Sequence, residues 1–289
     1  MFNIYGPFGA IIGDICGSRY EFHNYKGDHD IKLYEGCWVT DDTIHTLATM
    51  MACVYAKKLY DKNTEYDKFV FALKSGMKKA LLKLYELYPN VSYGEMFREW
   101  AKGDDHSPYN SYGNGAAMRV SPVAYIADTE QEVLDFAKAV TIPTHNHLQA
   151  IKGAKATALA TWMGLQGYSK QEIYDRMTDY YDIPDYRDLI GVYKFDETCQ
   201  GTVPQALSVF FGSDSFTDCL LNSIRVGGDT DTLAAIACSV ASGSYIIPVF
   251  CSKTCQKFLD GTMRKIIKSF YNVVNSRTLS SYKEVLFED

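Results

Sequence analysis

The chain has 289 residues, of which 47% are hydrophobic and 22% are charged, and its formal net charge is −6. This length is enough to bury a sizeable core, and the apolar content argues against extensive disorder. Acidic residues outnumber basic ones, 35 to 29, and no dense Lys/Arg run occurs, which disfavours nonspecific nucleic-acid binding.

Membrane and export signals are weak along the chain. No apolar stretch approaches the roughly 20 residues of a membrane-spanning helix, so we expect no membrane partner. The apolar first residues meet Asp14 without a basic segment ahead of them, and we interpret them as mature structure. The eight cysteines are scattered, and Cys251 and Cys255 lack the common zinc spacing. We therefore expect a reduced, cytoplasmic compartment.

Helical periodicity dominates the chain from its start. Gly9, Gly13 and Gly17 lie four residues apart and share one face of a helix. Each Gly costs ~1 kcal/mol relative to Ala in a helix, so we expect close packing against that face. Apolar residues at spacings of three and four then predict helices over residues 44–55, 69–84, 133–140, 147–166, 233–240 and 258–270.

Strand signals are absent from this pattern. We find no convincing alternation of apolar and polar residues, so the predicted fold class is all-α. The segment 177–200 is rich in Tyr and Asp, and we interpret it as a surface excursion between helices. With no repeat and no low-complexity linker, we expect a single domain over residues 1–289.

Two acidic clusters stand directly before predicted helices. The first is Thr40-Asp41-Asp42-Thr43, and the second is Gly227-Gly228-Asp229-Thr230-Asp231-Thr232. One Asp or Thr is explained by capping of the first helical turn. Two acids with a hydroxyl, used twice, favour a site for a hard cation such as Mg²⁺ or Mn²⁺. Capping with surface acids, and a calcium loop, remain alternatives at this stage.

Two further stretches carry polar groups near helix starts. The run from Ser111 to Arg119 contains Gly113-Asn114-Gly115, whose backbone N–H groups would suit an anion such as phosphate. An ordinary Asn-Gly turn explains the same residues. His145 and His147 open the long Ala-rich helix, and two His at this spacing do not share a helix face. Helix-start hydrogen bonding is the simpler interpretation for both.

Together these stretches resemble the ADP-ribosylglycohydrolase family, which includes dinitrogenase reductase-activating glycohydrolases and ADP-ribosyl-acceptor hydrolases. The resemblance runs from Gly9 to about Pro248, and five motifs occur in the family's order. They are the Gly13–Glu21 segment, Thr40–Thr43, Ser111–Arg119, Thr144-His145 and Gly227–Thr232.

The resemblance implies a compact, orthogonal all-α fold with two Mg²⁺ ions, for which Mn²⁺ could substitute. It implies metal ligation by Thr40, Asp41, Asp42, Asp229, Asp231 and Thr232. Gly113, Asn114 and Gly115 would line the ribose and diphosphate, and His145 would contact the ligand, with His147 as a second candidate. Glu21, Asp41 and Asp42 would be the catalytic acids, and Asp14 would brace the metal loops.

The implied function is hydrolysis of the glycosidic bond between ADP-ribose and an acceptor on a protein or small molecule. An arginine- or guanidine-type acceptor is our expectation, because the sequence is closer to the bacterial branch. Two other functions stay open: an ADP-ribose-binding module without turnover, and a hydrolase of O-linked, serine-type ADP-ribose. A third possibility is a metal-dependent phosphohydrolase, which would release phosphate.

Overall fold

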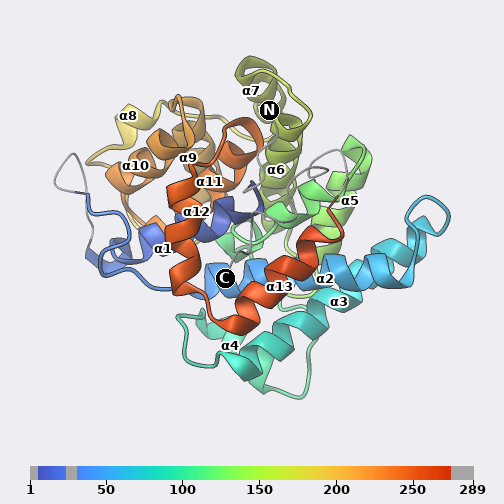
Figure 1. The fold of residues 1–289 in the computed structure, drawn as a ribbon. Coiled ribbons are helices and arrows are strands. Elements are labelled where there is room, and N and C mark those ends of the chain that lie inside the picture. Colours follow the sequence, from blue (N-terminus) through green and yellow to red (C-terminus); the bar gives the residue numbers. More distant parts are fainter. Residues whose placement is uncertain (1–5, 24–30, 275–289) are drawn as a thin grey trace.

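The computed structural model describes residues 6–23 and 31–274, and helices account for its architecture (Figure 1). The α-helices are α1 (Gly9–Ser18), α2 (Asp41–Leu59), α3 (Tyr66–Leu87), α4 (Glu95–Lys102), α5 (Glu130–Thr141), α6 (Leu148–Leu165), α7 (Lys170–Met177), α8 (Tyr186–Leu189), α9 (Cys199–Phe211), α10 (Phe216–Val226), α11 (Thr230–Ser244), α12 (Val249–Cys255) and α13 (Gly261–Tyr271). Short 3₁₀ helices are η1 (Gly6–Phe8), η2 (Glu21–His23), η3 (Asn114–Ala116), η4 (Ser121–Tyr125) and η5 (Gln256–Phe258). Within the described ranges there is no β-strand, which confirms the all-α prediction.

The glycine face of α1 packs directly against α11. A Cβ atom on Gly9 would lie 2.5 Å from the carbonyl oxygen of Cys238, and one on Gly17 would lie 2.5 Å from Cα of Asp231. A Cβ atom on Gly13 would lie 2.3 Å from the carbonyl oxygen of Ala234. This confirms the predicted close packing, and it brings α1 against the first turn of α11, where the second acidic cluster begins.

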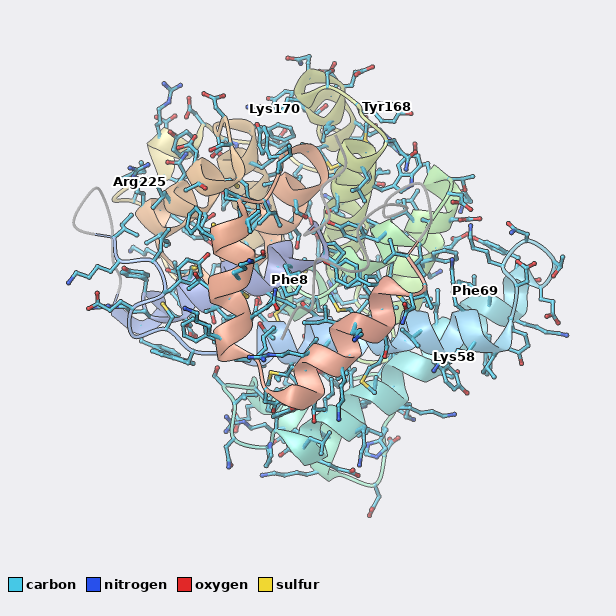
Figure 2. All side chains as sticks on the ribbon, viewed as in Figure 1. Phe8, Lys58, Phe69, Tyr168, Lys170 and Arg225 are labelled. Atoms are coloured by element: carbon cyan, nitrogen blue, oxygen red, sulfur yellow. The ribbon has the colours of Figure 1, made fainter. Side chains whose placement is uncertain are left out.

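The remaining helices surround this central pair. Helix α11 also contacts α6, α9 and α10, while α2 pairs with α3 and is crossed by α13 (Figure 1). Phe8 and Phe69 are fully buried, and Phe8 lies near the centre in Figure 2, whereas Lys58 is exposed. Among the described residues, no helix is both long and apolar enough to cross a membrane.

Two predicted segments differ from the structure. The apolar pattern over 258–270 predicted one helix, but η5 ends at Phe258 and α13 begins at Gly261. The break occurs because Asp260 caps α13, accepting from the backbone N–H groups of Thr262 and Met263. The segment 177–200 does not stay on the surface throughout, since Met177, Tyr181 and Cys199 are buried.

Candidate functional site

The start of α2 is held by a buried carboxylate from α1. Asp14 accepts from the hydroxyl of Thr40 at 2.6 Å and from the backbone N–H groups of Thr40 and Thr43 at 3.2 and 3.0 Å. Thr40 is the N-cap and accepts from the backbone N–H of Asp42. Asp14 therefore holds this turn, and because Thr40 is the cap, capping does not account for the carboxylates of Asp41 and Asp42.

The start of α11 depends on two glycines in the left-handed region. Gly227 has φ 75° and Gly228 has φ 80°, values that other residues rarely adopt. The turn they form leads into Asp229, which occupies the N-cap position without making a side-chain cap hydrogen bond. Asp229 instead accepts from Nδ2 of Asn114 at 2.6 Å. Helix capping therefore does not explain the acids of this cluster.

The two helix starts meet across the interior. The hydroxyl of Thr232 donates to Oδ2 of Asp42 at 3.3 Å, which joins clusters 190 residues apart in the sequence. Carboxylate oxygens of Asp14, Asp42 and Asp231 lie within 4.8 Å of one another, and so do those of Glu21, Asp229 and Asp231. Asp231 belongs to both groups, so the two possible cation positions are adjacent.

These carboxylates are destabilised in their charged form. Burial, followed by the charge of Asp231, raises the pKa of Glu21 to about 9 and raises that of Asp42 well above its usual range. Burial raises the pKa of Asp229 to about 7, and burial with the charge of Asp229 also raises the pKa of Asp231. Burial and the charge of Asp231 likewise raise the pKa of Asp41 well above its usual range. A nearby positive charge, such as a bound cation, would stabilise the charged form of these carboxylates.

The acidic clusters open into a cavity of about 560 Å³. Its predicted lining residues are Glu21, Asp41, Asp42, Gly113, Asn114, Gly115, His145, Asp229, Asp231 and Thr232. Thr40 is fully buried at the α2 cap and does not line it. The structure thus brings most of the predicted site residues together in one cavity, whereas neither Thr40 nor His147 lines it.

The Gly113–Gly115 loop is tied to the chain that precedes α9. The backbone N–H of Asn114 donates to the carbonyl of Glu197 at 2.7 Å, and that of Cys199 donates to the carbonyl of Tyr112 at 2.9 Å. Asn114 also donates through Nδ2 to the hydroxyl of Thr202 at 3.1 Å. The side chain of Asn114 therefore positions Asp229, while its neighbouring glycines allow Ser111 and His145 to approach the loop closely.

The two predicted histidines have different places. His147 is the N-cap of α6, and its Nδ1 accepts from the backbone N–H of Gln149, which is the helix-start role foreseen as the simpler one. His145 is buried, lines the cavity and contacts Thr144 through Nδ1 at 2.8 Å. Burial, followed by the charge of Arg119, lowers the pKa of His145 well below its usual range, so its ring is neutral.

Several cavity residues gave no clear sequence signal. Glu95 and Glu197 add carboxylates at exposed positions of the lining, outside the predicted clusters. His45 lies one turn into α2, stacks on Tyr93 at a ring-centroid distance of 5.5 Å and has no hydrogen-bond partner for either ring nitrogen. The spacing of Asp41 and His45, four residues apart on one helix, is the pattern that could have indicated His45.

The oxygen donors of the two clusters suit divalent cations. Oδ1 of Asp42 and Oε2 of Glu21 are buried and lack hydrogen-bond partners, and a buried unpaired carboxylate oxygen is costly. Oxygen ligands from carboxylates and threonine hydroxyls match the preference of Mg²⁺ or Mn²⁺. These residues therefore fit hard divalent cations.

Comparisons with known proteins agree with this geometry. A family model described as ADP-ribosylglycohydrolase matches residues 7–268. The chain is 25% identical to the ADP-ribosylhydrolase ARH3 of Homo sapiens, covering 82% of this chain and 83% of that protein. It is 28% identical to the ADP-ribosyl-[dinitrogen reductase] glycohydrolase of Rhodospirillum rubrum, with the same coverage of both chains. A solved ADP-ribosylglycohydrolase-related protein complex shares the fold, with TM-score 0.67 and 19% identity over 93% of this chain and 96% of that one.

Proposed function

The chain belongs to the ADP-ribosylglycohydrolase family of enzymes, and we propose that it is a Mg²⁺-dependent hydrolase that releases ADP-ribose from an arginine- or guanidine-type acceptor. The observation that carries the proposal is the sharing of Asp231 by two groups of carboxylates beneath one cavity. This arrangement suits two adjacent cations.

The residues that would hold the ions come from both helix starts. They are Thr40, Asp41, Asp42, Asp229, Asp231 and Thr232. The oxygen of Thr40 donates its hydrogen to Asp14 and accepts from Asp42, which leaves one lone pair. Bound Mg²⁺ supplies positive charge, orients substrate hydroxyls and lowers the pKa of a coordinated water.

The glycosidic bond sets the demands on the other groups. Its cleavage passes through an oxocarbenium-like state and needs an oriented ribose, a water and a proton for the leaving group. Asp41 and Asp42 line the cavity and are placed to accept a proton from that water. Glu21 lines the same cavity from η2 and would be the candidate for proton transfer at the leaving group. Gly113 and Gly115 line the same cavity and would contact the ribose and diphosphate.

The acceptor side of the proposal rests on charge. Seven carboxylate residues line the cavity, and no Lys or Arg is among the described residues of its lining. Glu95 and Glu197 lie outside both acidic clusters and are exposed. They can meet a guanidinium, which pairs with carboxylates through two parallel hydrogen bonds. A neutral serine-type acceptor would leave these two acids without a role.

The test is release of ADP-ribose from defined substrates. Peptides ADP-ribosylated on arginine or on serine, and an ADP-ribosylated small guanidine, are incubated with Mg²⁺ or Mn²⁺ and with EDTA, and products are separated by chromatography. We expect metal-dependent release of ADP-ribose, fastest from the arginine-linked substrates. No release from any substrate would contradict the proposal.

The same experiment separates the alternatives. Faster release from the serine-linked peptide would assign an O-linked acceptor. Tight ADP-ribose binding that survives EDTA, without turnover, would indicate a binding module. Release of free phosphate from ADP-ribose would indicate a phosphohydrolase.

A further inference from the structure

Arg119 is a buried cation beside the cavity with few partners. Its side chain is fully buried, and its Nε and Nη1 have no hydrogen-bond partner. Its contacts are made by Nη2, which lies 2.6 Å from the hydroxyl oxygen of Thr144 and 3.5 Å from Nδ1 of His145. No carboxylate forms an ion pair with it in the described part of the chain. Burial of a guanidinium with so few partners costs free energy, because its charge is neither paired nor fully hydrogen-bonded.

The direction of these hydrogen bonds follows from the chemistry of Arg. A guanidinium only donates, so the oxygen of Thr144 accepts from Nη2 and its own hydrogen remains available. That oxygen lies 2.8 Å from Nδ1 of His145, a contact in which either atom can be the donor, and the same hydroxyl also contacts the side chain of Tyr109. Nη2 of Arg119 lies 3.5 Å from Nδ1, and because a guanidinium only donates, this neighbour favours an Nδ1 that accepts and takes the hydrogen of Thr144. Both contacts leave the proton of the neutral imidazole on Nε2.

The protonated nitrogen faces the glycine loop of the cavity. A Cβ atom on Gly115 would lie 3.2 Å from Nε2 of His145, and one on Gly113 would lie 3.6 Å from it. The N–H of Nε2 therefore opens onto the wall formed by the Gly113–Gly115 loop, with the charge of Arg119 behind it. The carboxylates of both acidic clusters line the same cavity.

We infer that Arg119 is a positioning residue that acts through Thr144 to hold His145 in the Nε2–H tautomer, as a fixed hydrogen-bond donor to the diphosphate of the substrate. The identity of this anion rests on the proposed function, whereas the tautomer rests on the geometry alone. His145 then binds substrate without transferring a proton. The positive charge of Arg119 favours an anion at the same wall, because it has no carboxylate partner of its own.

The first test reads the tautomer directly. Nitrogen-15 chemical shifts of the His145 ring, assigned by their loss in His145→Gln, report which nitrogen carries the proton. We expect one tautomer with the proton on Nε2 in the unaltered protein. Thr144→Val keeps the side-chain shape but removes the hydroxyl, and we expect a mixture of tautomers. Thr144→Ser restores the hydroxyl and should restore the single tautomer.

The second test measures the consequence for the ligand. A hydrogen bond from a well-placed donor to a charged group is worth about 1.5–3 kcal/mol, or roughly a 10- to 150-fold change in Kd. We expect Thr144→Val and Arg119→Met to weaken ADP-ribose binding by at least about tenfold in calorimetry. KM should rise by a similar factor while kcat changes little, because the diphosphate is held equally in ground and transition states. Thr144→Ser should stay close to the unaltered protein.

Two results would overturn the inference. One is a proton on Nδ1 of His145 in the unaltered protein. The other is an unchanged tautomer together with an unchanged Kd in folded Thr144→Val. Arg119→Met removes a large buried side chain and can fail to fold. The comparison of Thr144→Val with Thr144→Ser therefore decides whether the inference holds, and thermal unfolding checks that both variants are folded. If the unaltered protein binds no ADP-ribose, the proposed substrate is wrong, and the chemical shifts still decide the tautomer.

Discussion

Nδ2 of Asn114 donates to Oδ2 of Asp229 at 2.6 Å, and this contact joins the glycine loop to the second acidic cluster. Asn114 is buried and its amide is further held by Thr202. A carboxylate oriented in this way presents its other oxygen in a fixed direction. The loop that we expect to line the substrate therefore also orients a proposed metal ligand.

Replacement of Asn114 by Ala should weaken the metal site without unfolding the protein. Loss of a hydrogen bond that orients a metal ligand typically costs 10- to 100-fold in metal affinity or activity, so we expect a fall of about that size in turnover. Mg²⁺ titration followed by calorimetry and the ADP-ribose release assay measure it. Asn63→Ala, in the loop before α3, is the matched control and should leave both quantities unchanged.

Removal of a proposed ligand carboxylate should have a larger effect. Asp229→Ala and Asp41→Ala should each abolish turnover and lower metal affinity, because each removes an oxygen donor from the site. The helical circular-dichroism signal should persist, since neither side chain contributes to the apolar core. Full activity in either variant would show that the metal assignment is wrong.

The metal-free protein should lose stability as the pH rises. Burial raises the pKa of Asp14 to about 6, that of Asp229 to about 7 and that of Glu21 to about 9, so the folded state binds more protons than the unfolded one. The resulting stabilisation is complete below the unfolded pKa values near 4 and is lost as the pH rises toward 9.

Thermal unfolding in EDTA between pH 5 and pH 9 measures this effect. We expect Tm to fall by at least about 5 °C over that range. Saturating Mg²⁺ should remove most of the fall, because a bound cation favours the charged carboxylates and stabilises the state that binds it. A Tm that rises with pH in EDTA would contradict the assigned pKa shifts.

The contact between α1 and α11 should not tolerate an added methyl group. Gly13→Ala would place Cβ against the backbone of Ala234, which cannot move aside as a side chain can. We expect a loss of about 1–3 kcal/mol or more in the free energy of unfolding, measured with urea. Gly261→Ala is the control, because a Cβ there meets no atom within 4 Å. Equal stability of the two variants would contradict the close packing.

Glu95 should contribute to a preference for a cationic acceptor. Glu95→Gln should raise KM for an arginine-linked substrate about two- to fivefold, the range expected for an exposed ion pair, and leave a serine-linked substrate unaffected. Glu99→Gln lies one turn further along α4, is exposed and does not line the cavity, so it should change neither. The same KM change on both substrates would argue against a charge-based role.

Local patterns made the helices and the two acidic clusters predictable. The spacing of apolar residues indicated α2, α3, α5, α6 and α11, and the glycines of α1 indicated a close contact on one face. The pair Gly227-Gly228 indicated an unusual turn, and both residues do have positive φ. The helix-start role of His147 followed from its place before the Ala-rich segment. The family resemblance placed the acids in one site, which spacing alone left open between a metal and capping.

The amino-acid sequence alone determined which residues could ligate a cation, because ligand chemistry depends on side-chain type and helix starts depend on neighbouring residues. Only the tertiary structure decided how these residues are supported. Glu197 lines the cavity because its neighbour Thr198 forms a β-bridge with Gly113. The segment that contains Glu197 has no helical or strand pattern in its sequence. Arg119 and His145 meet across 26 positions of sequence, and Thr232 and Asp42 across 190. Such pairings are set by the packing of whole helices, so no local spacing records them.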